Sequence, residues 1–297
     1  MASPGLFAVF ASVTRLHIVA IAALGTLTFG WIFTGTYPWL LVGICATDWF
    51  VVNLLNRVVD LEEDTANAIV GTGFVARHRR AVLALGFGLL ATSFVVVHML
   101  CPSITWLRAG YHALGLTYNW RLLPGGRRIK ELYFWKNTAS AMGFMITVFA
   151  YPLAQAGWGA GTVDDVSALT IIWAAAFFFP FELSYEVIYD LRDAPGDAAA
   201  GVKTYPVVHG VAGAVRIIDG LILCSSAALV AGWLAGDVPW RLFIMIVAPA
   251  LQLLLYKRAL KAGVTSRLCV GLTWMGAALL ATYHLWYLAE LPGSGLR

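Results

Sequence analysis

Charged residues are scarce in this chain of 297 residues: only 12% are Asp, Glu, Lys or Arg, whereas 60% are hydrophobic. A water-soluble fold of this size would lack the polar surface to cover itself, so a soluble globular protein is excluded. The net charge of +4 reflects basic loops and does not indicate nucleic-acid binding. The composition therefore indicates an integral membrane protein that lies in the lipid bilayer and binds no nucleic acid.

The sequence also lacks a metal-binding cysteine pattern and a leader-like start. Its four cysteines lie far apart in apolar segments, without the spacing of a metal site. The first twelve residues carry no basic region, and no clear small-residue cleavage site follows them. We therefore expect the first apolar segment to belong to the mature fold.

Long apolar runs are present instead, and they favour transmembrane helices over a β-barrel, because in lipid each backbone polar group must be satisfied within its own segment. The hydropathy predicts an all-α, polytopic membrane helix bundle of about nine transmembrane helices. The predicted spans are residues 16–35, 38–61, 80–100, 102–121, 132–153, 166–191, 209–235, 239–257 and 266–288.

Basic residues accumulate in alternate loops. Lys and Arg follow the second, fourth, sixth and eighth predicted spans, and the opposite loops contain none. The positive-inside rule then places the N-terminus in the cytoplasm. We expect a multi-pass protein of the cytoplasmic (inner) membrane whose acidic segments, described next, face the cytoplasm.

Carboxylates lie at the end of the second apolar span. Asn56, Asp60 and Asp64 recur every four residues and therefore form one stripe on a helix. Burying an uncompensated charge in hydrocarbon is expensive, so ionisable groups at this depth usually mark a polar cavity. A solvated helix end is the alternative, and it accounts better for Glu62 and Glu63 than for the stripe.

A second acidic segment lies at the end of the sixth span. Its carboxylates recur every three or four residues and comprise Glu182, Glu186, Asp190, Asp193 and Asp197. Two such segments at the same mouth of an apolar bundle suggest paired divalent-cation sites. Mg²⁺ suits carboxylate oxygens and is commonly completed by substrate phosphates. The sequence therefore predicts Mg²⁺ and a phosphorylated ligand.

These two segments resemble the motifs of the UbiA-type intramembrane prenyltransferases. Residues 56–64, Asn-Arg-Val-Val-Asp-Leu-Glu-Glu-Asp, are similar to the first motif of that family, N-D-x-x-D-x-x-x-D, with Arg57 where Asp is frequent. Residues 193–197 match its second motif, D-x-x-x-D. The order and the separation of the two motifs make the resemblance specific, and it extends over nearly the whole chain.

The resemblance implies one domain over residues 1–297, a bundle with a central cavity, and cytoplasmic loop segments 62–79 and 192–208 that cap the active site. It implies a Mg²⁺-dependent prenyltransferase, which moves a prenyl group from a polyprenyl diphosphate to a lipophilic acceptor that is aromatic or a quinone precursor. The residues expected to bind metal and to be catalytic are Asp60, Asp64, Asp193 and Asp197, with Lys136 as a further catalytic residue. The residues expected to bind substrate are Arg15, Asn56, Tyr118, Asn137, Tyr189, Asp190 and Lys203.

Several of these residues also have plainer interpretations. Lys136 and Lys203 fit ordinary loop charge, Arg15 fits positive-inside anchoring, and the two tyrosines fit aromatic packing. Asp190 fits a carboxylate that is solvated or paired with Arg192. Glu186 is far enough along the helix from Asp193 to touch the acceptor rather than the metal. The scattered histidines, including His17 and His112, are typical of core or interface positions.

The segment after the first motif departs from the family pattern. Of an Asn-Lys-Pro-x-Arg-Pro-like stretch it keeps only Asn67, so a basic group is missing or is supplied by Arg57 or by residues 77–80. This leaves the reaction subtype open. One alternative is a terpene cyclase of the same superfamily, which ionises a prenyl diphosphate without an acceptor. A remoter one is a cation or lipid transporter, disfavoured because both acidic segments lie on one membrane side. The sequence does not give prenyl chain length, acceptor identity or oligomeric state.

Overall fold

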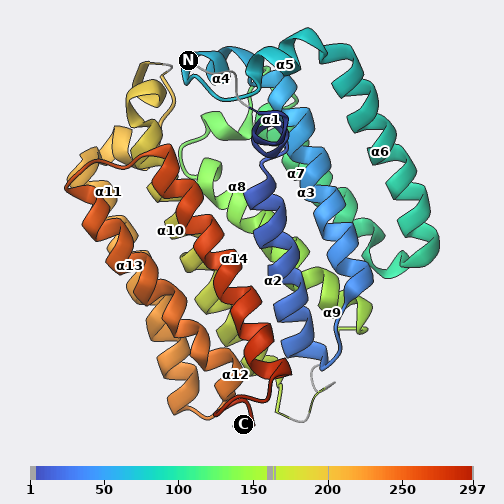
Figure 1. Cartoon of the computed structure of the whole chain (residues 1–297), viewed down its shortest axis with the longest axis vertical. Coiled ribbons are helices and arrows are strands. Elements are labelled where there is room, and N and C mark those ends of the chain that lie inside the picture. The colour runs from blue at the N-terminus through green and yellow to red at the C-terminus, as the bar shows by residue number, and fades with distance from the viewer. Residues whose placement is uncertain (1–4, 159–162, 164, 200, 296–297) are drawn as a thin grey trace.

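The structure is a computed structural model that describes residues 5–158, 163, 165–199 and 201–295. Every regular element among these residues is a helix (Figure 1). The longer helices are α2 (Leu16–Thr34), α3 (Trp39–Val59), α6 (Arg79–Leu100), α7 (Thr105–Asn119), α10 (Ala168–Ala199), α11 (Tyr205–Leu234), α13 (Val247–Leu260) and α14 (Ser266–Leu288). The shorter ones are α1 (Leu6–Val13), α4 (Leu61–Ala66), α5 (Thr72–Arg77), α8 (Trp135–Phe144), α9 (Tyr151–Gln155) and α12 (Trp240–Phe243).

Seven helical runs within the described residues are long and apolar enough to cross a membrane, namely α2, α3, α6, α10, α11, the run from α12 to α13, and α14. The prediction of an all-α membrane bundle is confirmed. The count of nine is not confirmed. The fourth predicted span contains a 3-10 turn over Pro102–Ile104 and the 15 residues of α7. The fifth is a run of α8, a π-helical turn over Met145–Ala150 and α9.

Helix α10 continues further than the hydropathy indicated. The predicted span ends at residue 191 and is followed by an expected loop, whereas α10 runs on to Ala199 through Pro180 and Pro195. Each proline removes only one backbone donor, and a helix can absorb that loss with a bend. The other expected loop, residues 62–79, contains the short helices α4 and α5. The whole second acidic stripe therefore lies on one continuous helix.

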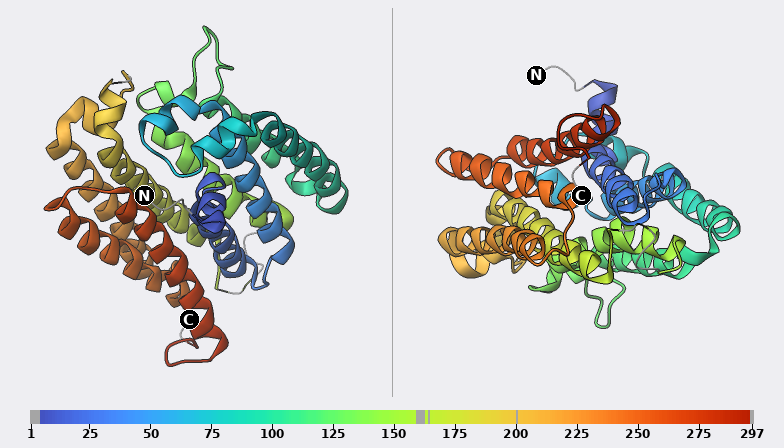
Figure 2. Two further views of the ribbon diagram at one scale, coloured as in Figure 1. Left: turned by 45° about the horizontal axis from the view of Figure 1, so that its top comes forward. Right: turned by 90° about the horizontal axis from the view of Figure 1, so that it is seen from below.

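The helices are arranged side by side in one bundle (Figures 1 and 2). Helix α10 packs along α11, and α2 packs between α3 and α14. Helix α6 lies at one edge of the bundle against α3. The short helices α4 and α5 lie over the end of the bundle opposite to the C-terminus (Figure 1). The two acidic segments lie at this same end, where α3 and α10 finish.

A buried ionic cluster connects α3, α6, α7 and α9. Arg108 donates to both carboxylate oxygens of Asp48, at 3.0 and 2.5 Å, and to the carbonyl and hydroxyl oxygens of Ser93, each at 3.1 Å. The same carboxylate lies 3.0 Å from Nε2 of His112 and accepts from the hydroxyl of Tyr151 at 2.8 Å. Such complete pairing is what a charge away from water requires. His112 is therefore a core residue, as predicted, although its acidic partner was not foreseen.

Glycine permits a close approach where α2 turns into α3. A Cβ atom added at Gly30 would lie 2.5 Å from Cγ of Pro38 and 3.3 Å from Cγ of Pro152. Both neighbours are proline rings, which cannot rotate out of the way. Any side chain at Gly30 would therefore displace backbone.

We expect Gly30→Ala to destabilise the protein by about 1–3 kcal/mol, the usual range for overpacking a close contact. Gly43→Ala on α3 is the matched control, because nothing lies within 4 Å of a Cβ added there. That control should lose no stability, since Ala is the better helix former. Thermal unfolding in detergent measures both variants. Equal midpoints for the two would contradict the close packing.

Candidate functional site

Both acidic segments line one cavity of about 1170 Å³ inside the bundle. Asn56 and Asp60 reach it from the end of α3, and Asp64 reaches it from α4. Asp190, Asp193 and Asp197 reach it from the last turns of α10. The structure thus brings together two segments that are about 130 residues apart in the chain. This convergence arises because α3 and α10 end on the same side of the bundle.

Most of the predicted site residues line this cavity, namely Arg15, Asn56, Asp60, Asp64, Tyr118, Lys136, Tyr189, Asp190, Asp193 and Asp197. Two do not. Asn137 is buried behind the wall, where its side-chain amide donates to Asp190 at 2.8 Å, so it positions that carboxylate rather than facing a ligand. Lys203 is exposed beyond the end of α10. Its place fits the plainer interpretation of ordinary loop charge.

Asp60 is held by two donors. Nζ of Lys130 donates to one carboxylate oxygen and Nδ2 of Asn119 to the other, each at 2.7 Å. Lys130 also donates to Glu63 at 2.5 Å. The side chain of Lys130 is buried and lines the cavity. Sequence reasoning missed Lys130, although it lies in the basic loop that set the predicted membrane orientation.

Arg57 explains the departure in the first motif. Its Nη1 donates to Asp64 at 2.7 Å, and its Nη2 donates to the carbonyl of Ser12 at 2.9 Å. Both partners of the ion pair are buried. An Asp in place of Arg57 would put a second carboxylate beside Asp64. In this chain a cation neutralises Asp64 instead.

The second segment is also compensated by cations. Nζ of Lys136 lies 2.8 Å from Asp190 and 3.1 Å from Asp197, so it bridges two turns of α10. Arg192 pairs with its neighbour Asp193 at 2.5 Å. Asp190 is therefore paired with a lysine from α8 and not with Arg192. Each candidate aspartate thus has a Lys or Arg partner.

Glu63 shows the effect of these cations outside the membrane-spanning segments. Burial raises the pKa of its carboxyl, but hydrogen bonds and charge from Lys130 and Arg128 outweigh burial and hold the pKa below its ordinary value. The side chain lies at the rim of the cavity, on α4. Glu63 thus shares Lys130 with Asp60, and its pKa is lowered by that lysine and by Arg128.

The donor chemistry at this end fits a divalent cation. Oδ1 of Asn56 and Oδ1 of Asn119 are both buried and have no hydrogen-bond donor. Oxygen atoms of carboxylates and amides are the ligands that Mg²⁺ prefers. Across the residues that the structure describes, however, no three Asp, Glu, His or Cys side chains gather closely enough to hold a metal ion. In this arrangement the carboxylates are paired with Lys and Arg instead.

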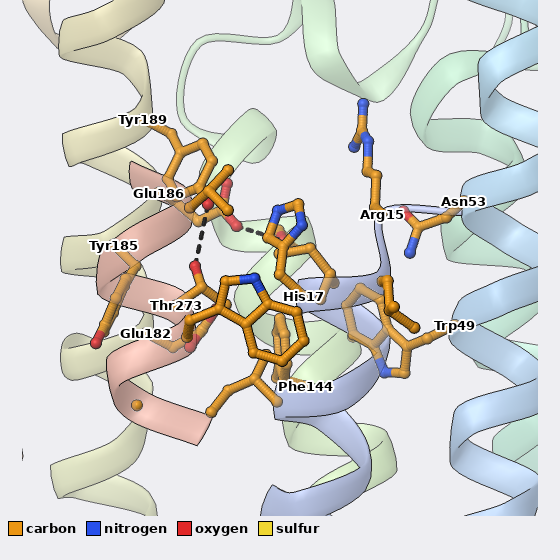
Figure 3. A pocket seen from close by; sticks show the side chains of 18 of the residues that line it. Arg15, His17, Trp49, Asn53, Phe144, Glu182, Tyr185, Glu186, Tyr189 and Thr273 are labelled. Atoms are coloured by element: carbon orange, nitrogen blue, oxygen red, sulfur yellow. Dashed lines mark hydrogen bonds between the residues drawn. The ribbon is translucent and has the colours of Figure 1, made fainter. Parts of the chain in front are cut away.

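Deeper in the cavity the two walls differ (Figure 3). Glu182, Tyr185, Glu186 and Tyr189 of α10 and Thr273 of α14 form one wall. Within it the hydroxyls of Tyr189 and Thr273 lie 3.0 Å apart. Trp49 of α3 and Phe144 of α8 lie on the other wall, and Phe177, Phe178 and Phe181 line the cavity from the deeper part of α10. His17 lies between the walls, which corrects its prediction as a core or interface residue. The cavity thus combines a charged mouth with a long interior.

Comparisons of the sequence and of the fold with known proteins point to the same family. A model of the UbiA prenyltransferase family matches residues 16–270. The digeranylgeranylglyceryl phosphate synthase of Methanopyrus kandleri is 25% identical over 207 residues, which cover 68% of this chain and 69% of that protein.

Solved structures of UbiA homologues share the fold of this chain. A UbiA homologue from Archaeoglobus fulgidus, bound to GPP and Mg²⁺, superposes with a TM-score of 0.69 at 15% identity, covering 93% of this chain and 98% of that one. The apo structure of a UbiA homologue from Aeropyrum pernix K1 superposes with a TM-score of 0.66 at 17% identity, covering 91% and 98%. At these identities the structures show a common fold.

Proposed function

This chain belongs to the UbiA prenyltransferase family, as its motifs indicated, and we propose which groups it transfers. It is a prenyltransferase, and in our proposal it moves a prenyl group from a polyprenyl diphosphate to a lipophilic aromatic or quinone-precursor acceptor within the membrane. The observation that carries this proposal is the single cavity lined by both acidic segments. Relatives of the same fold have been solved with GPP, DMAPP and Mg²⁺, which supports the choice of donor and metal.

We assign the diphosphate of the donor to the charged mouth. Lys136, Lys130 and Arg15 line this region and carry the positive charge that a diphosphate needs. Mg²⁺ would be held by Asp60, Asp64, Asp193 and Asp197, and it would supply the positive charge that stabilises diphosphate as a leaving group. Asn56 and Asn119 would orient this set through their free carbonyl oxygens.

The interior of the cavity suits the chemistry of an allylic cation. Breaking the bond between the allylic carbon and oxygen leaves positive charge on the prenyl chain, and aromatic faces such as Trp49 and Phe144 stabilise a nearby cation. The apolar wall also excludes water, which would otherwise capture the cation. The residues of this chain thus bind the donor at one end and protect its reactive carbon at the other.

The membrane orientation follows from charge. We propose that the mouth of the cavity and the N-terminus face the cytoplasm, because Lys and Arg accumulate at the loops on that side. A diphosphate donor made in the cytoplasm would then reach the site without crossing the bilayer. The membrane is proposed to be the cytoplasmic one.

The proposal is tested with purified protein, Mg²⁺, labelled geranyl diphosphate and a panel of phenolic acceptors. We expect release of diphosphate together with a prenylated acceptor. Cyclic hydrocarbon as the sole product, formed without any acceptor, would show a terpene cyclase instead. Cation flux across liposomes without diphosphate release would show a transporter.

Lys136 is expected to contribute to donor binding. We expect Lys136→Met to raise the KM for the prenyl diphosphate by roughly ten- to a hundredfold, the usual effect of losing a charge-assisted hydrogen bond. Lys261→Met is the control, because Lys261 is exposed and does not line the cavity. Steady-state kinetics at saturating Mg²⁺ measures the effect. An unchanged KM in Lys136→Met would contradict the assignment.

A further inference from the structure

The deep wall of α10 carries two carboxylates that the proposed metal and diphosphate site does not use. Glu182 and Glu186 lie one helical turn apart, and both line the cavity. At about 1.5 Å per residue, Glu186 lies roughly 6 Å deeper than Asp190, and Glu182 lies roughly 12 Å deeper. Figure 3 shows both carboxylates on the side of α10 that faces the cavity. They therefore lie below the mouth, along the path of the reacting groups.

These carboxylates have few partners. Glu186 accepts one hydrogen bond, from the hydroxyl of Ser140 at 2.7 Å. Within the described part of the chain, Glu182 forms no hydrogen bond or ion pair, and Glu186 forms no ion pair. A carboxylate among apolar side chains is costly unless donors reach it. A ligand that donates hydrogen bonds would remove this cost.

Two other residues that line the cavity carry a buried polar atom without a hydrogen-bond partner. Nδ2 of Asn53 and the hydroxyl of Tyr111 have no hydrogen-bond partner, and these side chains are only 4% and 2% exposed. Both residues line the cavity, and Figure 3 shows Asn53 across from Glu186. Buried polar groups in folded proteins are nearly always paired. The free amide of Asn53, across from Glu186, thus points independently to a polar ligand in this region.

A prenyl chain does not fit this polar wall. Apolar carbon against Glu182 and Glu186 would leave both carboxylates without donors. Trp49 and Phe144 across the cavity, together with Phe177 deeper on α10, offer the chain a matching aromatic surface instead. The polar wall is therefore left for the second substrate.

We infer that Glu182 and Glu186 form the subsite for the acceptor, an inference that rests on the proposed function. The acceptor carries a neutral hydroxyl rather than a carboxylate, and Glu186 receives the proton of that hydroxyl. Glu186 takes this role because it is the nearer of the two to Asp190 and the diphosphate. Glu182, one turn deeper, accepts a hydrogen bond, and a carboxylate on the acceptor would meet a second acid there instead of a cation.

The step balances without any further reagent. The bond between the allylic carbon and the diphosphate oxygen breaks, and its electron pair leaves with diphosphate. The acceptor supplies the pair for the new bond to that carbon, from its hydroxyl oxygen or from a ring carbon conjugated with it, while the hydroxyl proton passes to Glu186. When a ring carbon attacks, the ring hydrogen is then lost as a proton and the oxygen regains one.

The test uses the full-length protein with geranyl diphosphate and three matched acceptors: a long-chain alkylphenol, its methyl ether and the corresponding benzoate without the hydroxyl. We expect the wild type to prenylate only the phenol. We expect Glu186→Gln to lower kcat for the phenol at least about 100-fold, as loss of a general base does. Glu182→Gln should mainly raise the KM for the phenol, by about tenfold. Glu290→Gln, on an exposed residue outside the cavity, is the control.

Binding of a non-cleavable geranyl thiodiphosphate separates the possible failures. Unchanged donor affinity in both variants, with the kinetic losses above, supports the inference and shows that the variants are folded. Wild-type kinetics in both Gln variants, or transfer to the benzoate or the methyl ether, would overturn the acceptor assignment alone. A wild type that binds the donor but releases no diphosphate with any acceptor would overturn the proposed function, and the inference with it.

Discussion

Asp60→Asn and Asp193→Asn are each expected to lower the rate of diphosphate release by about 1,000-fold, at the upper end of the effect of removing one group that stabilises developing charge. Each change replaces a carboxylate oxygen by an amide and removes one negative charge. The cation site is thereby weakened at the point where it would face the diphosphate. The measurement is release of diphosphate from labelled geranyl diphosphate over a range of Mg²⁺ concentrations.

The two positions differ in what the substitution leaves behind. Asp60→Asn removes one partner of Lys130, but that lysine keeps Glu63 at 2.5 Å. Asp193→Asn removes the partner of Arg192, whose guanidinium also lies over the ring of Tyr189, 4.9 Å from its centre. Neither change leaves an isolated buried cation, so both variants should insert in the membrane and elute from a sizing column like the wild type.

Glu62→Gln is the matched control for these variants. Glu62 lies in the same motif segment, but it is exposed and does not line the cavity. It should retain wild-type turnover and the same dependence on Mg²⁺. Chelation of divalent cations should stop diphosphate release by the wild type and by this control alike. Full turnover in both Asp variants would defeat the metal assignment.

The acidic stripes were predictable because they depend only on the spacing of neighbouring residues along one helix. Spacings of three and four residues place side chains on one helical face in any context, so Asp60 and Asp190 could be assigned from sequence. The positive-inside rule predicted that both stripes end on the same side of the membrane, and the resemblance to the family implied that they share one cavity. Helix geometry and charge therefore carried the prediction as far as the candidate site.

The cations that neutralise the carboxylates were harder to foresee. Lys130 pairs with Asp60 across 70 residues, and its contact depends on a loop whose path no periodicity specifies. Arg57 was recognised as a departure, but its bond to Asp64 requires the turn between α3 and α4. The extension of α10 through Pro195 was missed for a related reason: a proline lowers helix propensity locally, whereas packing decides whether the helix continues.

The ionic cluster around Asp48 could not be read from the sequence. Asp48 and Arg108 are separated by 60 residues, and each lies within an apolar segment, where a lone charge is ordinarily a sign of function. Neither residue lines the cavity. Because the charges of Asp48 and Arg108 are paired with each other and neither side chain lines the cavity, we interpret the cluster as structural. Breaking the cluster should therefore lower the stability of the protein without changing its catalytic rate.

Arg108→Met is expected to destabilise the protein by about 3–5 kcal/mol, because it leaves the buried carboxylate of Asp48 with only His112 and Tyr151 as partners. Arg216→Met is the control, since Arg216 is exposed on α11 and should change stability little. Unfolding in mixed detergent micelles measures both variants.

The double variant Asp48→Leu with Arg108→Met separates two contributions to stability: the destabilisation caused by an unpaired buried charge, and the net stability that the ion pair contributes. A buried ion pair contributes little net stability once both charges are replaced by apolar groups, so the double variant should recover much of the loss. At a temperature where all variants are folded, each should release diphosphate at the wild-type rate. If Arg108→Met were as stable as Arg216→Met, the carboxylate would have to reach water or be protonated, and the cluster would not hold α3, α6 and α7 together.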